Sequence, residues 1–382
     1  MKKKIFTALG LMTGTSMDGV DLSLIKSDGY SEFATILNVY NEFNEDLRKK
    51  LINLRDKIFV IKDLEKLSKE IDILEREITI FHHEIISNKL KDYEDQIDLI
   101  GFHGQTIFHN SKEKISKQLG NGKLLSQFTK KIVVNDFRQN DLNNCGQGAP
   151  LTPIFHKLIT NIMHKKKQIN FPINIINIGG ITNITQIFNH EYFKDDNFCA
   201  YDIGPGNCLI DEWVRKNSKK KFDENGNIAN SGKVNNLILN QAIDNFSNNK
   251  YERSLDVKDF DTSFVKGLSL EDGCATLTKF TAFLIAQGIE NINFKNKNTE
   301  TINLICGGGR KNNFLIKNIS DHLDNTKTKL YNIDNYGFDG DFIESQTFGF
   351  LAIRTFLKLP ISFPLTTRCK TPTVGGTINK NF

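Results

Sequence analysis

The chain opens with a short turn of small and polar residues that could bind an anion. Gly14, Thr15, Ser16, Asp18 and Gly19 lie between two apolar runs that predict strands. Glycines accept positive φ and let the backbone approach a ligand, while the hydroxyls and backbone N–H groups can donate to phosphate oxygens. Asp18 could hold a cation that the phosphate shares. An ordinary hairpin turn with capping residues is the alternative that this stretch alone leaves open.

Polar side chains also stand at the ends of other predicted strands, where α/β sheets bind their ligands. His103 and Arg138 each follow a short apolar run, and Asp202 ends a third run just before Gly-Pro-Gly. A guanidinium such as that of Arg138 can grip a carboxylate, and a carboxylate on a rigid strand end can act as a general base. A structural histidine and a helix-capping aspartate are the plainer interpretations of His103 and Asp202.

A glycine triplet and a glutamate near a helix start complete the candidate residues. Gly307, Gly308 and Gly309 follow a predicted strand and would let a flat ligand, such as a nucleotide base and ribose, lie against the backbone. A tight strand-to-helix turn explains the same triplet equally well. Glu344 lies near the start of the helix predicted over 341–357, where it could hydrogen-bond a ligand or simply face solvent.

The elements that would position these residues form two similar units. Each unit begins with a strand, a turn of small residues, a returning strand and a third strand, and helices follow. The repetition predicts a duplicated α/β architecture with a cleft between the copies. The predicted strands cover 4–12, 20–26 and 33–39 in the first unit, and 174–178, 181–188 and 199–203 in the second.

Helices are predicted where apolar residues recur at spacings of three and four. The clearest stretch runs from Leu64 to Ile85, with Lys, Glu and Asp on the other faces. Its stripe could pair two chains, but burial against the sheet is the simpler interpretation because the stripe is short. Further helices are predicted over 207–216, 233–246, 271–290 and 341–357, and residues 360–381 are expected to form an irregular tail.

Composition bounds the class of protein and its compartment. At 382 residues the chain exceeds the usual size of a single core, so two domains are expected. The net charge of +5 is mild and the lysine runs are short and scattered, which argues against a nucleic-acid-binding surface. The six cysteines show no C-x-x-C pairing and indicate reduced thiols in the cytoplasm. No segment has the pattern of a signal peptide or the length of a membrane span.

Eight sequence blocks, taken in order, resemble one known family along nearly the whole chain. The blocks are GLMTGTSMDGVD at 10–21, GFHGQTIFH at 101–109, DFR at 136–138, GQGAPLTP at 146–153, NIGGITN at 177–183, DIGPGN at 202–207, CGGGR at 306–310 and ESQTF at 344–348. They are similar to those of the anhydro-N-acetylmuramic acid kinases, a family of the sugar kinase, Hsp70 and actin superfamily. One short motif arises easily by chance, whereas the ordered set does not.

The resemblance implies a two-domain, actin-like α/β ATPase fold. Each domain would be a mixed five-stranded sheet flanked by helices, with the active site in the interdomain cleft. An N-terminal domain with the phosphate hairpin would cover 1–135, and a C-terminal domain with the catalytic aspartate and the adenosine-binding glycines would cover 136–382. The C-terminal tail is expected to pack back on the first domain.

The resemblance also implies an activity, in which ATP, water and 1,6-anhydro-N-acetylmuramic acid give N-acetylmuramic acid 6-phosphate and ADP in peptidoglycan recycling. Asp202 would be the catalytic base, and His103, Arg138 and Glu344 would bind the sugar. Asp18 would lie near Mg²⁺, directly or through water. The nucleotide-binding residues would be Gly14, Thr15, Ser16, Met17, Asp18, Gly19, Val20, Asp21, Asn177, Gly179, Gly180, Gly204, Gly307, Gly308 and Gly309. A cytoplasmic homodimer with neither nucleic-acid nor membrane partners is expected.

Two other functions stay open on the sequence alone. One is a kinase of the same superfamily that phosphorylates another sugar or an acid, and the other is a non-catalytic regulator that binds nucleotide or sugar. The chain also departs from the family pattern in two loops. Around 251–256 a segment with proline and lysine is expected before the serine, and Arg368 stands where a glycine usually follows the threonines. Both departures affect loop geometry rather than the implied chemistry.

Overall fold

The computed structural model describes residues 4–190, 197–247, 255–293, 301–323 and 328–382. These residues divide into two compact units, which are treated separately below. Unit 1 contains residues 4–162 and 342–382, and unit 2 contains 163–190 and 197–341. This division differs from the predicted boundary after residue 135, because residues 136–162 and 342–382 belong to the first unit.

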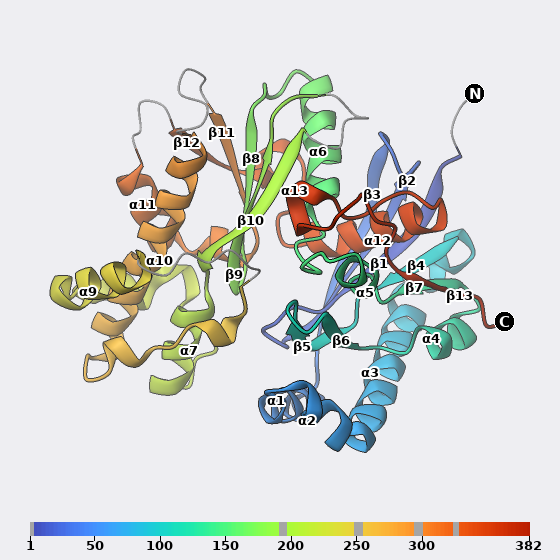
Figure 1. Ribbon diagram of the computed structural model, residues 1–382, viewed down its shortest axis with the longest axis horizontal. Helices are drawn as coiled ribbons and strands as arrows, with labels where there is room; N and C mark the ends of the chain where they lie inside the picture. Colours follow the sequence, from blue (N-terminus) through green and yellow to red (C-terminus); the bar gives the residue numbers. More distant parts are fainter. Residues whose placement is uncertain (1–3, 191–196, 248–254, 294–300, 324–327) are drawn as a thin grey trace. The chain divides into compact units, whose positions relative to one another are not determined.

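Unit 1 is built on a six-stranded mixed sheet with the order β13-β7-β4-β1-β2-β3 (Figure 1). Strand β1 pairs antiparallel with β2 and parallel with β4, and β13 pairs antiparallel with β7. The sixth strand is a correction to the five that were expected, because the tail supplies β13 and is therefore not irregular throughout. The strands are β1 Phe6–Met12, β2 Gly19–Ser27, β3 Phe33–Glu42, β4 Leu99–Phe102, β7 Ile132–Asn135 and β13 Thr377–Asn379.

Alternation along β2 decides which helices cover each face of this sheet. Val20, Leu22 and Leu24 lie in one hydrophobic core with residues of α1 and α3. Ser23, on the opposite face, bonds Ser345 of α12 through the two hydroxyl oxygens at 2.7 Å. The sheet is therefore covered by α1 (Glu45–Lys57) and α3 (Ser68–Lys89) on one side and by α12 (Ile343–Phe356) on the other.

Helix α12 approaches the sheet closely and is buried on nearly all sides. A methyl group at Gly10 would lie 1.8 Å from the Ser345 carbonyl oxygen, and one at Gly101 would lie 2.1 Å from that of Phe348. The two glycines on adjacent strands thus make room for the helix backbone, which fixes Glu344 at the start of α12 relative to the sheet.

Unit 2 repeats the strand arrangement of unit 1. Its five strands have the order β10-β9-β8-β11-β12, with the first three antiparallel and the remaining pairs parallel, as in β3-β2-β1-β4-β7. This shared order confirms the predicted duplication and the α/β class. The strands are β8 Ile173–Ile178, β9 Ile181–Ile187, β10 Phe198–Pro205, β11 Thr301–Cys306 and β12 Thr328–Asn332.

Helix α10 connects two hydrophobic clusters in unit 2. Ile285 and Ile289 pack with Ile176 of β8 and Ile319 of α11, whereas Cys274 packs in a second cluster with residues of α7 and α9. The helices of this unit are α7 Cys208–Asn217, α8 Asn227–Ser231, α9 Asn236–Ser247, α10 Leu270–Asn293 and α11 Asn313–His322.

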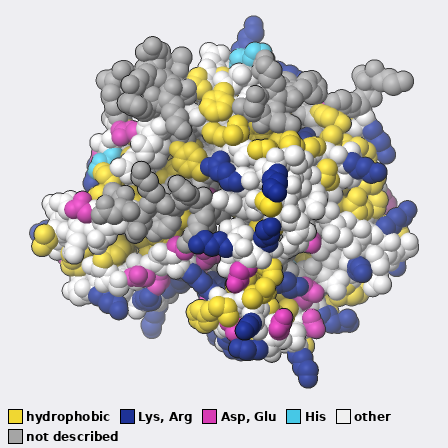
Figure 2. All heavy atoms as spheres, viewed as in Figure 1, with side chains coloured by type: hydrophobic (Ala, Val, Ile, Leu, Met, Phe, Trp, Pro, Cys, Tyr) yellow, Lys and Arg dark blue, Asp and Glu magenta, His cyan; other side chains and the backbone are white. Residues whose placement is uncertain are grey.

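The remaining elements are short and lie mainly in unit 1. They are α2 Ile61–Lys66, β5 Gln105–Asn110, β6 Ile115–Leu119, α4 Gly122–Thr129, α5 Gln139–Asn143, α6 Pro153–Lys165 and α13 Pro364–Thr367. Among the described residues, no helix is both long enough and apolar enough to span a bilayer. On the face drawn in Figure 2, Lys and Arg side chains are scattered among uncharged ones.

Candidate active-site residues

The predicted phosphate turn joins β1 to β2 in unit 1. Thr15 and Ser16 at its tip are exposed, whereas the Met17 side chain is fully buried at φ 55°. The Met17 amide donates to the Gly14 carbonyl at 3.2 Å, which closes the turn. Since Val20 is also buried in the core, Met17 and Val20 could meet a nucleotide only through their backbone.

The segment that follows β4 forms hydrogen bonds with the phosphate turn. The Gln105 side-chain amide donates to the Gly14 carbonyl at 3.1 Å, and the Thr13 hydroxyl donates to the Gly104 carbonyl at 2.6 Å. The block around His103 therefore supports the shape of the turn, in addition to any contact it makes with a ligand.

Helix α1 places two arginines beside the turn, and sequence reasoning missed both. Arg48 Nη2 lies 3.0 Å from Asp18 Oδ1, and Arg55 Nη1 lies 3.5 Å from the Thr15 carbonyl oxygen. The two arginines are seven residues apart and so share one face of the helix. The available signal was the spacing of Leu47, Leu51 and Leu54, which marks an amphipathic helix directly after β3.

Carboxylates gather around the base of the turn. Asp21 is paired across the strands with Tyr40, and a methyl group at Gly19 would lie 2.8 Å from the Tyr40 hydroxyl. Burial, together with the nearby charges of Asp18, Glu42 and Asp21, raises the pKa of Tyr40 to about 12. A cation bound at this position would meet a negative local field, which Arg48 partly offsets.

Within the described residues, no group of three or more His, Cys, Asp or Glu could hold a metal ion. Mg²⁺ does not need such a cage, because it keeps several waters and is usually bound by one or two carboxylates with substrate phosphates. Asp18 fits this pattern as a single carboxylate at an exposed turn.

His103 and Arg138 lie together in unit 1, and their contacts define their roles. His103 is 4% exposed, its Nδ1 donates to the Gly104 carbonyl at 2.7 Å, and its Nε2 accepts from Arg138 Nη2 at 2.9 Å. Because a carbonyl can only accept, the ring proton resides on Nδ1. Burial and, next, the Arg138 charge lower the pKa of His103 well below its usual value, so the ring is neutral.

The guanidinium of Arg138 is tied to a buried network beyond His103. Arg138 Nη1 donates to the Gly148 carbonyl at 2.8 Å, and the Gly148 amide donates to Asp141 Oδ2 at 2.7 Å. The Thr367 hydroxyl donates to the other Asp141 oxygen at 2.6 Å. Arg368, directly after this threonine, has φ 67°, the left-handed conformation that favours glycine, which gives a physical reason for the glycine expected there.

Glu344 is half-buried in the first turn of α12, next to Ser345, which bonds Ser23 of β2. The structure thus places the three predicted sugar-binding residues in unit 1, at the ends of β4, β7 and the start of α12. The other departure from the family pattern, around residue 251, lies mostly outside the described residues.

Asp202 lies on β10 of unit 2, at an irregular point of the ladder. The pairing of β10 with β9 shifts register between Asp202 and Gly204. Asp202 is half-buried, and its Oδ2 accepts a hydrogen bond from the Leu255 amide at 2.8 Å. A carboxylate at a strand irregularity, oriented by a backbone amide, has the fixed position that a general base needs.

The Gly179-Gly180 turn of unit 2 holds the start of α7. The amides of Gly206 and Asn207 donate to the carbonyls of Gly180 and Gly179, each at 2.8 Å. Among the described residues, a methyl group at Gly179 would meet only the Ile181 carbonyl oxygen within 4 Å, at 3.5 Å, so the turn has open space beside it. Gly204 and Asn177 are buried, the latter beside Cys306 at the end of β11.

The three glycines after β11 differ in what surrounds them. A methyl group at Gly309 would lie 2.2 Å from Ile178 Cγ2, and one at Gly307 would lie 2.4 Å from Asn177 Oδ1. At Gly308 the nearest atom would be Asn207 Nδ2, at 3.9 Å. The fold therefore needs small residues at 307 and 309, whereas the space beside Gly308 is available to a ligand.

The buried guanidinium of Arg310, directly after the triplet, stabilises this loop through hydrogen bonds and ion pairs. This group is 3% exposed and contacts Asp341 Oδ1 at 2.5 Å and Asp334 Oδ2 at 3.0 Å. Nη1 also donates to the Gly307 carbonyl at 3.1 Å, and the Gly307 amide donates to the Gly340 carbonyl at 3.0 Å. Arg310 thus has a structural role that the sequence motif did not reveal.

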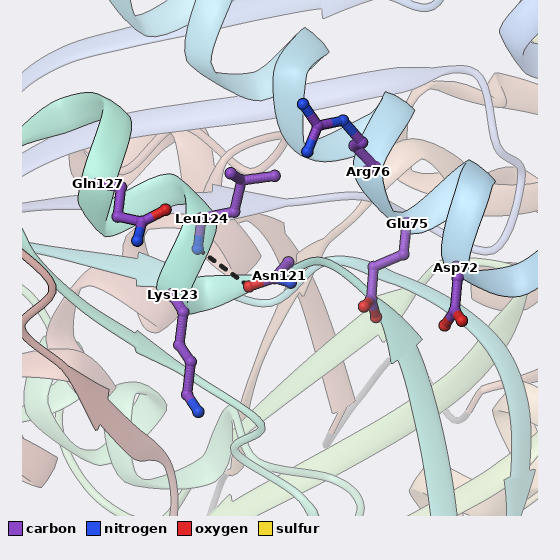
Figure 3. Close-up of a pocket in the computed structure, with 7 residues that line it drawn as sticks. All are labelled: Asp72, Glu75, Arg76, Asn121, Lys123, Leu124 and Gln127. Atoms are coloured by element: carbon purple, nitrogen blue, oxygen red, sulfur yellow. Dashed lines mark hydrogen bonds between the residues drawn. The ribbon is translucent and has the colours of Figure 1, made fainter.

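A hollow of about 340 Å³ lies between α3 and α4, away from these residues (Figure 3). Two of its polar groups have partners, since Glu75 pairs with Lys117 at 2.8 Å and Asn121 Oδ1 accepts from the Leu124 amide at 2.9 Å. None of the predicted site residues lines it. The lining residues are Asp72, Glu75, Arg76, Asn121, Lys123, Leu124 and Gln127.

Two mixed sheets that share one order of five strands, each with an open glycine-containing turn at a strand end, define the class as a two-unit α/β fold with a repeated sheet. The family follows from direct comparison. The chain belongs to the anhydro-N-acetylmuramic acid kinase family, whose model matches residues 6–381.

Individual relatives align with this chain over nearly their full length. An anhydro-N-acetylmuramic acid kinase from Pelagibacter ubique is 51% identical over 385 aligned residues, covering 100% of both chains. One from Brucella suis is 33% identical and covers 97% of both chains. Among solved structures, the activator of the 2-hydroxyisocaproyl-CoA dehydratase from Clostridium difficile, with bound ADPNP, aligns with 92% of this chain and 96% of its own at 11% identity and a TM-score of 0.39.

Proposed function

We propose that this chain is an ATP-dependent kinase that converts 1,6-anhydro-N-acetylmuramic acid and water to N-acetylmuramic acid 6-phosphate in cell-wall recycling. The observation that carries the proposal is family membership over residues 6–381, with 51% identity to a relative of that name along the whole chain. The candidate residues described above can meet the chemical demands of this reaction.

The reaction joins two bond changes. The anhydro sugar has no free 6-hydroxyl, so water attacks C1 and the C1–O6 bond of the bridge breaks. O6 then attacks the γ-phosphorus of ATP, and the bond from that phosphorus to the ADP oxygen breaks. The proton of the attacking water must be accepted by a base.

Asp202 is our choice for that base. Its position on β10 and the hydrogen bond from the Leu255 amide to Oδ2 hold the carboxylate in one orientation. Removing the water proton as the C1–O6 bond breaks makes the oxygen a better nucleophile, which is how a general base lowers the barrier.

The nucleotide is assigned to two turns. The exposed hydroxyls of Thr15 and Ser16 and the amides around Gly14 would donate to the phosphates, and the open side of Gly308 would accept the base or ribose. Phosphoryl transfer depends mainly on such positioning and on neutralised charge. Mg²⁺, held near Asp18, would neutralise charge on the transferring phosphoryl group.

Arg138 is assigned to the lactyl carboxylate of the sugar, because a guanidinium suits a planar anion. Glu344 is assigned to a ring substituent. His103 has both ring nitrogens engaged, and so we assign it the positioning of Arg138 rather than direct contact with the sugar. We also propose a homodimer, and a cytoplasmic location because the reaction consumes ATP.

The test is to incubate the protein with ATP, Mg²⁺ and the anhydro sugar in ¹⁸O-labelled water, and to measure the mass of the sugar product by mass spectrometry. The expected product gains phosphate and one labelled water. If the sugar gained phosphate without water, the protein would be a plain sugar kinase that phosphorylates a free hydroxyl. That result would contradict the coupled reaction. Nucleotide binding without any product would indicate a regulator.

Replacing Asp202 by asparagine tests the assigned base. Asparagine can still accept the Leu255 amide, so the fold should persist, but it cannot take a proton. We expect turnover in a coupled ADP assay to fall by at least about 100-fold, the usual contribution of general base catalysis. Calorimetric affinity for ATP should change little, and near-wild-type turnover would remove Asp202 from this role.

A further inference from the structure

Hydrogen bonds join the phosphate turn to the start of helix α1. The Phe43 amide donates to the Asp18 carbonyl at 2.9 Å, and Asn44, the next residue, caps α1 by accepting from the Leu47 amide at 2.8 Å. The start of α1 is therefore fixed to the backbone of Asp18, one turn of helix before Arg48.

Arg48 is held in place by this attachment and by the burial around it. Its side chain is 21% exposed, against 38% for Asp18, and it reaches Asp18 Oδ1 at 3.0 Å. Its Nε is buried and makes no hydrogen bond within the described residues. Leu47 and Leu51, on either side of it along the helix, are buried in the core of unit 1, so α1 cannot rotate to move the guanidinium away.

The charge of Arg48 matters because of what the turn is proposed to bind. A lone carboxylate at the mouth of a triphosphate site repels the negatively charged ligand. Asp21 and Glu42 add negative charge nearby, since both raise the pKa of Tyr40, as Asp18 does. An arginine on Oδ1 partly offsets the charge of Asp18 and fixes its orientation without competing for the exposed tip of the turn, Thr15 and Ser16.

We infer that Arg48 is a positioning residue for nucleotide binding, which neutralises and orients Asp18 beside the phosphate turn. This inference rests on the proposed function, since it takes the turn to be the phosphate site. Arg48 acts through Asp18, and no contact between Arg48 and the nucleotide is required.

The test measures ATP binding by calorimetry without sugar, with Mg²⁺ and with EDTA, in wild type, Arg48→Gln, Arg48→Lys and Lys49→Gln. Lys49 is the matched control, because it is the next residue on α1 and is 73% exposed in a pair with Glu45. We expect Arg48→Gln to weaken ATP binding by about tenfold or more, as for loss of a charge-assisted hydrogen bond. The loss should be greater in EDTA, where no added cation offsets Asp18.

The control variants separate this role from a general loss of structure. Lys49→Gln should bind ATP as the wild type does, and Arg48→Lys, which keeps the charge, should recover part of the affinity. In an Asp18→Asn background, Arg48→Gln should have little further effect, because the charge on which it acts is gone. That comparison remains decisive even if Arg48→Gln is less stable to heat.

Three results would overturn the inference: unchanged ATP affinity in Arg48→Gln, an equal loss in Lys49→Gln, or an additive loss in the Asp18→Asn background. Failure of the proposed function gives a different result. A wild-type protein that binds ATP but leaves the anhydro sugar unchanged would contradict the assigned reaction while leaving the link between Arg48 and Asp18 intact.

Discussion

His103 and Arg138 show how a residue at a proposed sugar site can act through its neighbour. The two ring nitrogens of His103 are used by the Gly104 carbonyl and the Arg138 guanidinium. The ring also packs against Phe348 of α12, with ring centroids 4.4 Å apart. A neutral, buried histidine of this kind sets the direction of Arg138 and has no free nitrogen for a sugar hydroxyl.

Replacing His103 by phenylalanine tests this role. The ring keeps its packing but loses the acceptor for Arg138, so Arg138 should lose its fixed direction. We expect the KM for the sugar to rise by about tenfold or more, as for loss of a hydrogen bond to a charged group, with the KM for ATP unchanged. His103→Gln, which can still accept, should recover part of the loss. An equal rise in both KM values would point to a purely structural effect.

At the scale of single elements, the loop after β11 combines an open glycine with two that the fold requires. Arg310 contacts the Gly307 carbonyl and the carboxylates of Asp334, Asp339 and Asp341, so the loop is held next to Gly308. A rigid loop with one open position is suited to a flat ligand, because the ligand need not order the loop when it binds.

Alanine substitutions at adjacent glycines test this reading of the loop. Gly308→Ala should melt like the wild type, since its methyl group has space, and should weaken ATP binding by about tenfold through contact with the ligand. Gly309→Ala should instead lower the melting temperature, because its methyl group would lie 2.2 Å from Ile178 Cγ2. Thermal melting and ATP calorimetry on both variants give the comparison. Unchanged ATP affinity in a stable Gly308→Ala would exclude Gly308 from the nucleotide site.

Elements with strong local patterns were predictable, and those defined by distant pairing were not. Strands β1 and β2 are long and apolar with a small-residue turn between them, so their hairpin was predicted almost to the residue. Strand β13 has three residues and exists only because Ile378 pairs with Val134, far back in the sequence. The same limit applies to the site, where motifs identified the turn but not Arg48, whose role depends on how α1 packs.

At the scale of the whole molecule, the two units share a strand order but differ in their buried histidines. His82, His103, His109 and His156 all lie in unit 1, and burial lowers the pKa of each below 6.5. In unit 2 the described histidine with a lowered pKa is His322, which is only half-buried. Unit 1 thus carries most of the predicted sensitivity to acid.

The sign of this effect follows from proton linkage. Below pH 6.5 an unfolded chain protonates these histidines while the folded chain does not, so protons favour unfolding. Stability is therefore complete above pH 6.5 and falls as the pH drops toward the folded pKa. For His82, fully buried with a pKa of about 4, the loss approaches about 3 kcal/mol at the acid limit.

Urea midpoints at pH 7.5 and 5.5 test the prediction in wild type, His82→Gln and His83→Gln. His82 packs inward against Phe102 with centroids 4.8 Å apart, whereas His83 is the partly exposed next residue on α3. We expect His82→Gln to shrink the difference between the two midpoints, and His83→Gln to leave it as in the wild type. Hydrogen exchange at pH 5.5 should show unit 1 peptides losing protection before those of unit 2. Earlier loss in unit 2, or an unchanged midpoint difference in His82→Gln, would mean that acid acts on groups other than these buried histidines.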